Sequence, residues 1–346
     1  MKRKLFVWGG AGLLLLLLSI IVSLSLGSAH IPIAQVWGVL LKQLPVVGHY
    51  VPVTWPESSE QIILRVRLPR IVLGILIGAA LSVSGAGFQG VLRNPLADPY
   101  TLGVASGASL GAAFLILFGL HFALFGIWTI PIVAFATGII TLLVVFRLAG
   151  VQGRFRTETV ILSGVVVSSF LSAIVSFMVA LSSKTVVNEI LFWLMGSLSL
   201  RGWSYTGVMV LYLTLGSAVL IAYSRPLNLF ALGERHAAHL GIRVDRTKWV
   251  VLLVSTILTA AAVSVCGVIG FVGLITPHLV RLLVGPDYRL IIPLSIVFGG
   301  VYVLWADTLA RMVLSPTEIP LGVVTAFLGA PFFAYLLSRQ KKMVRT

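Results

Sequence analysis

Long stretches without a charged side chain recur along this 346-residue chain. Five of them have the length of one bilayer crossing: residues 5–29, 71–92, 159–183, 202–224 and 319–338. An α-helix rises about 1.5 Å per residue, so about 20 apolar residues reach across a membrane. Only 10% of the residues are charged and 58% are hydrophobic, whereas an ordinary soluble domain has about a quarter charged residues. The composition therefore predicts an all-α membrane protein.

Two further uncharged stretches, 99–146 and 249–280, are too long for one crossing. We expect each to fold back once at its internal Gly and Pro residues. The first crossing has a basic MKRK start and a run of leucines, as in a signal peptide, but its length favours a retained helix over residues 5–26. The sequence thus predicts one transmembrane domain, residues 1–346, with about ten helices.

The charges indicate how such a bundle is oriented. An N-terminus in the cytoplasm followed by ten crossings leaves 18 of the 25 Lys and Arg residues on the inside. Cytoplasmic loops of membrane proteins are enriched in these residues, so we expect both termini in the cytoplasm and a multi-pass protein of the cell membrane. The formal net charge of +15 is then a sign of topology, and no nucleic-acid partner is expected.

The predicted outside carries basic residues that oppose this bias. Arg65, Arg67 and Arg70 precede the second crossing, and Arg311 follows the ninth. They could snorkel to lipid headgroups or form helix-end pairs, such as Asp307 with Arg311 at i, i+4 spacing. They could equally dock acidic side chains of an external protein through bidentate contacts. Charge alone leaves both interpretations open.

An offset of 182 residues aligns AALSVSGAGFQGVLRNP at 79–95 with AAVSVCGVIGFVGLITP at 261–277, with seven of 17 positions identical. The two copies would cross the membrane in opposite directions, as in an inverted-topology repeat with halves at about 70–181 and 248–338. Chance similarity between Gly-rich apolar helices is the alternative. Small residues are expected to let helices pack closely, among them Gly74, Gly78, Gly85, Gly87, Gly103 and Gly107.

The longest polar loop on the predicted inside, residues 224–246, has the pattern of two short amphipathic helices. We expect turns or helix ends at Gly233 and Gly241, and solvent-facing charge at Glu234 and Arg235. Such a loop suits a groove on another protein, or the membrane surface. Its apolar contacts are expected from Leu229, Phe230, Leu232, Ala237, Ala238 and Leu240.

Several kinds of chemistry find no support in the residues. The chain has no GxxxxGK[ST] phosphate loop, so we do not expect it to hydrolyse ATP. Cys266 is the sole cysteine and the six histidines are scattered, so neither a disulfide framework, a metal site nor a catalytic group is expected. Asp307 is the nearest candidate for an acid within the membrane, which weakens but does not remove an ion-coupled secondary transporter as the rival function.

Six blocks from about residue 60 to the C-terminus resemble the permease family of type II ABC importers, which import iron-siderophore complexes, haem and cobalamin. The blocks are RLPR at 67–70, GAALSVSGAGFQGVLRNPLADPYTLGVASGASLG at 78–111, ALGERHAAHLG at 231–241, GFVGLITPHLVR at 270–281, ADTLAR at 306–311 and EIPLGVVTAFLGAPFF at 318–333.

This resemblance implies a type II importer permease fold with ten helices per subunit, paired with a second copy or a paralogous permease around a central path. It implies two further partners: an ATP-binding cassette ATPase dimer, which would hold ATP and Mg²⁺, and an extracytoplasmic solute-binding protein. No cofactor is expected on this chain itself. The expected cargo is an iron-siderophore complex, with cobalamin or haem as the alternatives.

The resemblance also assigns roles to particular residues. Coupling to the ATPase falls on Leu232, Gly233, Glu234, Arg235, Ala238 and Gly241. Docking of the binding protein falls on Arg67, Arg70 and Arg311. The cytoplasmic gate falls on Asn94 and Leu96 before the third crossing, and on Thr157 and Glu158 before the fifth. For Asn94 a helix N-cap is the competing interpretation.

Overall fold

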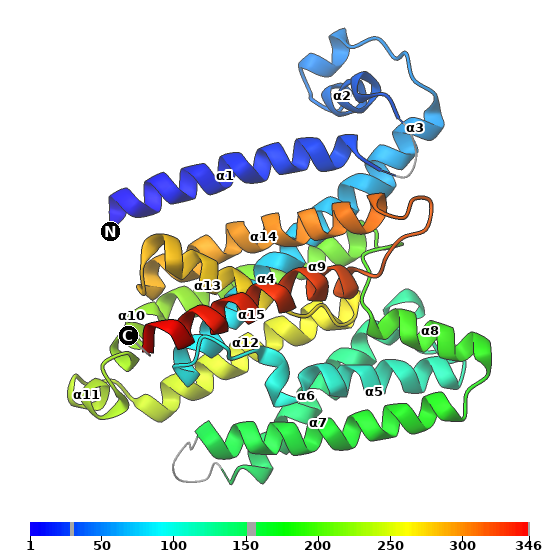
Figure 1. Ribbon diagram of the computed structural model, residues 1–346. Coiled ribbons are helices and arrows are strands. Elements are labelled where there is room, and N and C mark those ends of the chain that lie inside the picture. The colour runs from blue at the N-terminus through cyan, green and yellow to red at the C-terminus, as the bar shows by residue number, and fades with distance from the viewer. Residues whose placement is uncertain (28–30, 151–156, 345–346) are drawn as a thin grey trace.

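The computed structural model describes residues 1–27, 31–150 and 157–344, and every regular element in them is a helix. The long helices lie side by side in one bundle, with the short helices at its two ends (Figure 1). The α-helices are α1 (Lys2–Ser25), α2 (Ile33–Lys42), α3 (Glu57–Gln61), α4 (Leu68–Leu92), α5 (Val104–Leu117), α6 (Thr129–Leu148), α7 (Thr157–Ala180), α8 (Lys184–Leu194), α9 (Trp203–Ala222), α10 (Ser224–Phe230), α11 (Glu234–His239), α12 (Val244–Cys266), α13 (Val272–Val284), α14 (Tyr288–Met312) and α15 (Leu321–Val344). Single turns of other helix types are η1 (Val47–Tyr50), η2 (Ile62–Arg67), η3 (Pro99–Leu102) and η4 (Gly126–Trp128).

Seven helical segments of the described chain are long and apolar enough to cross a membrane: those of α1, α4, α6, α7, α9, α12 and α14. Of the four shorter apolar helices, α5, α13 and α15 over Leu321–Leu336 lie in the bundle, and with them it has the ten helices that the sequence predicts. The two long uncharged stretches each contain a break, because α5 and α6 divide the first and α12 and α13 divide the second. The prediction of an all-α membrane fold is confirmed.

Helix α4 is the centre of the bundle (Figure 1). It packs against α14, α12, α13 and α9, and 83% of its most apolar stretch is buried. Polar contacts tie it to these neighbours: Ser84 Oγ donates to the carbonyl oxygen of Ser255 at 2.5 Å, and Gln89 Nε2 donates to that of Gly273 at 3.2 Å. Hydrogen bonds of this kind help to hold helices together in lipid, because moving an apolar side chain from lipid tails into a helix contact gives little free energy.

Close backbone contact is possible because α4 carries glycines where its neighbours approach. A Cβ atom on Gly78 would clash with the carbonyl oxygen of Gly299 on α14, and one on Gly85 would clash with that of Gly273 on α13. Among helices α5 to α8, which we call the second group of helices, a Cβ atom on Gly107 of α5 would clash with Thr141 of α6. The predicted role of the small residues in close packing is confirmed at these positions.

The order of helices repeats along the chain. Residues 68–180 form helices of 25, 14, 20 and 24 residues, and residues 244–344 form helices of 23, 13, 25 and 24 residues. Helices α4 and α12 run in opposite directions, since Ser84 meets Thr259 while the later Gly87 meets the earlier Val251. The two halves thus have helices in a similar order, and the repeat itself stays a prediction. The 182-residue alignment pairs continuous helix in α4 with the break at residues 267–271.

Residues 31–67 form a small lobe that projects beyond the bundle at one end, around α2 (Figure 1). Its own apolar cluster joins Val36 and Val39 of α2 to Trp55, and also to Leu24 of α1 and Ile63 of η2. The lobe is thereby attached to the ends of the two crossings that it connects.

The contact of α4 with α13 predicts a sharp difference between two glycines. We expect Gly85→Ala to lower the free energy of unfolding by about 1–3 kcal/mol, because the added methyl group meets a backbone carbonyl that cannot turn away. Gly207→Ala in α9 is the matched control, since no atom lies within 4 Å of its added methyl group. Thermal unfolding of the purified protein in detergent measures both, and equal melting temperatures for the two variants would contradict the contact.

Candidate functional site

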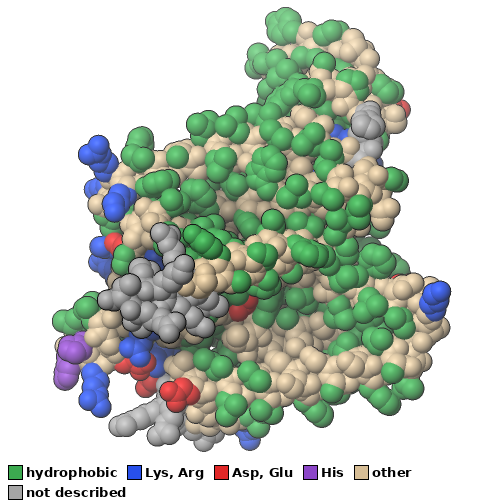
Figure 2. Space-filling model, viewed as in Figure 1, with side chains coloured by type: hydrophobic (Ala, Val, Ile, Leu, Met, Phe, Trp, Pro, Cys, Tyr) green, Lys and Arg blue, Asp and Glu red, His purple; other side chains and the backbone are tan. Residues whose placement is uncertain are grey.

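The two ends of the bundle differ in charge. One end carries the N-terminus, α10 and α11, and its exposed side chains include Arg225, Arg235, Arg243 and Arg246. Figure 2 shows Lys and Arg gathered at this end, whereas the sides of the bundle are mostly hydrophobic. We call it the basic end, and we call the end that holds Arg70 the opposite end.

The predicted pair of short helices lies at the basic end. Helix α10 (Ser224–Phe230) and helix α11 (Glu234–His239) are separated by Gly233 with φ +100°, and α11 is followed by Gly241 with φ +85°. Both glycines hold backbone conformations that other residues rarely adopt. The prediction of two helices with glycine turns is therefore confirmed.

The apolar side chains of this loop point in two directions. Phe230 and Ala237 are buried against the bundle, whereas Leu232 and Leu240 are each 61% exposed. Ala238 and Arg235 are exposed as well. The loop therefore anchors itself with one set of residues and presents an apolar surface, flanked by charge, with the other.

Glu234 faces solvent as expected only in part, because its side chain is 37% exposed and its carboxylate also meets two basic groups. Its carboxylate lies 2.8 Å from Lys248 Nζ on α12 and 3.7 Å from Arg93 Nη2 at the end of α4. The Lys248 side chain is almost fully buried, so the pair is partly withdrawn from water. The sequence pattern of a short loop cannot reveal this, because Arg93 lies 141 residues earlier in the chain. Glu234 thus joins the loop to two central helices.

A second connection joins α10 to the start of α14. Asn228 Nδ2 donates to Asp287 Oδ1 at 2.6 Å, and Asn228 Oδ1 accepts from the backbone N–H of Tyr288 at 2.7 Å. Hydrogen bonds from Arg289, and that of Asn228, lower the pKa of Asp287 to about 2, so the carboxylate stays ionised. Sequence reasoning missed Lys248, Asn228 and Asp287, because no local spacing connects them.

The predicted gate residues lie on two elements near the basic end. Asn94 and Leu96 follow the last residue of α4 and are exposed, while Thr157 and Glu158 begin α7. Asn94 is not a helix N-cap: its side chain accepts from the backbone N–H of Leu96 at 2.9 Å, and the next helix starts only at Pro99. The gate role stays a prediction.

The predicted docking arginines lie at the opposite end, but inside the protein. Arg67, Arg70 and Arg311 are only 4%, 8% and 4% exposed. Arg70 on α4 makes two hydrogen bonds to Asp307 Oδ1 on α14, at 2.8 and 3.0 Å, and one to Glu318 Oε1 at 2.8 Å. The cluster thus joins α4 to α14 and to the loop after α14.

The other members of this cluster complete its network. Arg311 Nε lies 3.1 Å from Asp307 Oδ2, which confirms the predicted i, i+4 pair, and Arg67 Nη1 donates to the carbonyl oxygen of Leu24 at 2.7 Å. Burial acts to raise the pKa of Glu318, but the hydrogen bonds from Arg70 and Ser199 prevail and lower it below its usual range. Each predicted docking arginine therefore has a partner within this chain, and its docking role stays a prediction.

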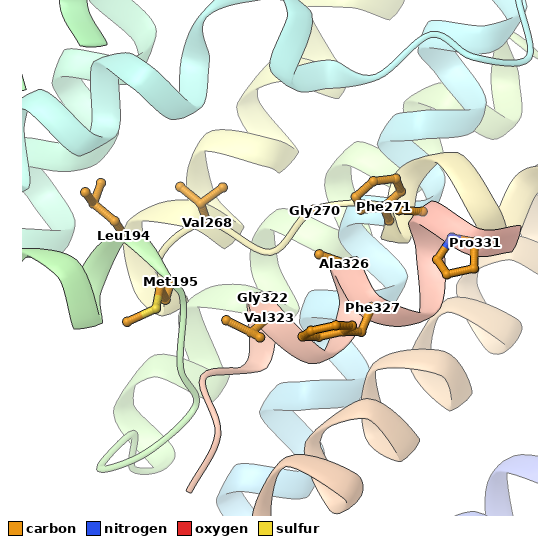
Figure 3. Close-up of a pocket in the computed structure, with 11 residues that line it drawn as sticks. Leu194, Met195, Val268, Gly270, Phe271, Gly322, Val323, Ala326, Phe327 and Pro331 are labelled. Atoms are coloured by element: carbon orange, nitrogen blue, oxygen red, sulfur yellow. The ribbon is translucent and has the colours of Figure 1, made fainter. Parts of the chain in front are cut away.

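A cavity of about 590 Å³ lies between the end of α8, the break at residues 267–271 and α15. Figure 3 shows side chains from these three segments around it, including Met195, Phe271 and Phe327. Every residue that lines the cavity is apolar or glycine. Phe271 adopts the left-handed conformation with φ +67° just before α13, where it places its ring on this wall. The cavity can accommodate a bulky group but offers no charged side chain to bind it.

Comparison with known proteins decides the family, because residues 15–339 match the FecCD transport family. The chain belongs to the FecCD transport family. It is 41% identical to the cobalamin import system permease protein of Halobacterium salinarum, over 97% of each chain. It is also 36% identical to the iron(3+)-hydroxamate import system permease protein of Bacillus subtilis, over 96% of this chain and 83% of the relative.

A solved structure has the same architecture. It is described as an inward-facing conformation of a transporter of the metal-chelate ABC type, and it superposes with a TM-score of 0.82 at 33% identity. The match covers 98% of this chain and all of that one. This protein is therefore a multi-pass ABC importer permease of the FecCD family, as the motifs between residues 67 and 333 predict.

The buried cluster at the opposite end predicts a large loss of stability when its central acid is removed. We expect Asp307→Ala to lower the free energy of unfolding by about 3–5 kcal/mol, because Arg311 would be left buried without its carboxylate and Arg70 with only one of two. Asp245→Ala, at an exposed position of α12, is the matched control and should change stability by less than about 0.5 kcal/mol. Unfolding in detergent would refute the network if both variants matched the wild type.

Proposed function

We propose that this permease works as one of two permease subunits and imports an iron-siderophore complex, with energy from an ATP-binding cassette ATPase dimer at the basic end. The observation that carries the proposal is the construction of the α10–α11 loop. It turns Leu232 and Leu240 outward to a partner, while Glu234 is bound to Lys248 of α12. A movement of the loop caused by the ATPase would therefore also move α12.

The basic end faces the cytoplasm in this proposal, and both termini lie there. The support is the distribution of exposed Lys and Arg residues, which gather at this end among the described residues of Figure 2. An ATPase in the cytoplasm then meets α10 and α11 directly. ATP and Mg²⁺ belong to that partner.

Movement of the loop can reach the core through two contacts. One is the pair of Glu234 with Lys248 and Arg93, on α12 and α4. The other is Asn228 with Asp287 at the start of α14. Because α12 and α14 both pack against α4, the contacts act on one unit. Alternating access then consists of tilting this unit relative to the second group of helices, α5 to α8.

The path for the cargo is proposed to run between the two copies along α7. This helix exposes hydroxyl groups in a row, at Ser169, Ser172 and Ser176, with Ser106 of α5 beside Ser172 at 3.5 Å. A row of hydroxyls suits a wet passage better than lipid tails. The proposed gate consists of two pairs of residues near the basic end. Thr157 and Glu158 are at the start of α7, and Asn94 and Leu96 follow the end of α4.

A solute-binding protein is proposed to dock at the opposite end. The arginines assigned by resemblance are buried and have partners within this chain. Their proposed contribution is therefore to fix the conformation of the docking surface; these arginines are Arg67, Arg70 and Arg311. Arg65, two residues before Arg67, is exposed and can meet an acidic side chain directly.

The cargo is proposed to be a ferric siderophore, as for the iron(3+)-hydroxamate relative. The apolar cavity supports a bulky chelate, which needs room and few specific contacts. Cobalamin is the second candidate, favoured by the Halobacterium salinarum relative at 41% identity. A relative named for molybdate also exists, but a small oxyanion needs hydrogen-bond donors that this cavity lacks.

Two substitutions in the loop should fail in different ways. Leu232→Asp should abolish co-purification of the ATPase, because it puts a charge into an apolar contact. Glu234→Gln should leave the ATPase bound but lower ATP-driven transport at least about tenfold, because the tie to Lys248 loses its charge. Arg246→Gln, at an exposed position of the same end, is the control and should do neither. Normal transport by both loop variants would exclude the coupling role.

Reconstitution with the ATPase and the binding protein tests the cargo. We expect uptake of ferric siderophore into proteoliposomes only when ATP is supplied, and no uptake of cobalamin or haem by the same complex. Uptake of cobalamin alone would select the second candidate. Uptake driven by an ion gradient, without any ATPase present, would instead establish the rival secondary transporter.

A further inference from the structure

A second hollow lies at the basic end and has a different chemistry from the apolar cavity. Its volume is about 270 Å³, and it is formed by the end of α4, by α10 and by the turn between α13 and α14. The polar side chains that line it are Gln89, Arg93, Asn94, Arg281 and Tyr288, and no acidic residue is among its lining. We call it the Arg281 pocket.

Arg281 is held in place by neutral groups. Its Nη2 donates to Gln89 Oε1 at 3.3 Å and to Tyr288 Oη at 3.0 Å. Gln89 is itself fixed, because its amide nitrogen donates to the carbonyl oxygens of Gly273 and Leu274. Within the described chain no carboxylate forms an ion pair with Arg281. The guanidinium is therefore positioned, and its charge has no counterion among the residues that the structure describes.

Two carboxylates at the same end of the bundle have other partners. Asp287 is bound by Arg289 and by Asn228, and Glu234 lies 2.8 Å from Lys248. Arg93, the second guanidinium of the pocket, is 3.7 Å from Glu234 and its side chain is half exposed. The pocket thus combines two guanidinium groups, an amide and a phenol, with a local excess of positive charge.

We propose that the Arg281 pocket binds a phosphoryl group, held by Arg281 and Arg93 with Asn94 and Tyr288 as further hydrogen-bond donors. Guanidinium groups match phosphate oxygens in geometry and charge, which makes such pairs among the stronger contacts in proteins. The binding itself needs only this chain, so it can be tested without the ATPase or the binding protein.

The phosphoryl group can come from an anionic lipid or from a soluble phosphate. Leu282, the next residue of α13, is 63% exposed and offers an apolar group for an acyl chain beside the pocket. A soluble phosphate needs no such surface. Either ligand contacts Arg93, which also faces Glu234, so occupancy of the pocket is linked to the position of the α10–α11 loop.

The experiment uses the full chain, delipidated in detergent, with two probes. One arm measures binding of inorganic phosphate by equilibrium dialysis, and the other measures binding of dioleoylphosphatidylglycerol by native mass spectrometry against dioleoylphosphatidylcholine. We expect one probe to bind the wild type and Arg281→Gln to weaken that binding at least about tenfold, the effect of losing one charged hydrogen bond. Arg246→Gln, an exposed arginine of the same end outside the pocket, should bind as the wild type does.

The outcomes are distinct. Binding of phosphate alone identifies a soluble ligand, and preference for the phosphatidylglycerol probe identifies a lipid site. If neither probe binds the wild type, the proposal is overturned. This holds even if Arg281→Gln is found to lose a protein partner. Equal affinity of the wild type and Arg281→Gln also overturns it. If Arg281→Gln elutes as aggregate, Arg93→Gln and Arg281→Lys decide by the same comparison, the first weakening binding and the second retaining most of it.

Discussion

Direct contact between the backbone of α4 and those of its neighbours is the constraint on which the rest of this structure depends. Association of helices in lipid gains little from burying apolar side chains, so it relies on close packing and hydrogen bonds. Gly78 against Gly299 and Gly85 against Gly273 allow that packing, and Ser84 adds a hydrogen bond to α12. Because α4 is held along its whole length, both of its ends have fixed surroundings.

Those surroundings suit two different tasks. At the opposite end Arg70 lies in a buried ionic network, where each guanidinium has a carboxylate or carbonyl partner and removal of one partner is costly. At the basic end Arg93 meets Glu234 at 3.7 Å in a half-exposed pair, which can rearrange at little cost. One end of α4 is therefore fixed by a buried ionic network, whereas the ion pair at its other end, beside the α10–α11 loop, can rearrange.

The positions of the long apolar helices could be predicted because backbone polar groups in lipid must be satisfied within helices, which makes hydropathy informative. The glycine turns at 233 and 241 could be predicted for a similar reason, since few residues adopt positive φ. The break at residues 267–271 was not predicted, because an interruption of a helix leaves little trace in an apolar sequence, and the 182-residue alignment runs straight across it. Asn94 was open to an N-cap interpretation because asparagine is common both at helix N-caps and in turns where its side chain accepts from the backbone two residues later, as it does here from Leu96.

By itself the sequence determined that this chain is a bundle of about ten membrane helices, that it lacks a phosphate loop, and that its motifs are those of an importer permease. Only the tertiary structure decided which charges meet. Glu234 is bound to Lys248 and Arg93, the Arg70 cluster is buried, and Arg281 has no counterion among the described residues. The physical reason is that composition and periodicity act over one helix, whereas ion pairs form between groups that the packing of helices brings within a few ångströms, however far apart they lie in the chain.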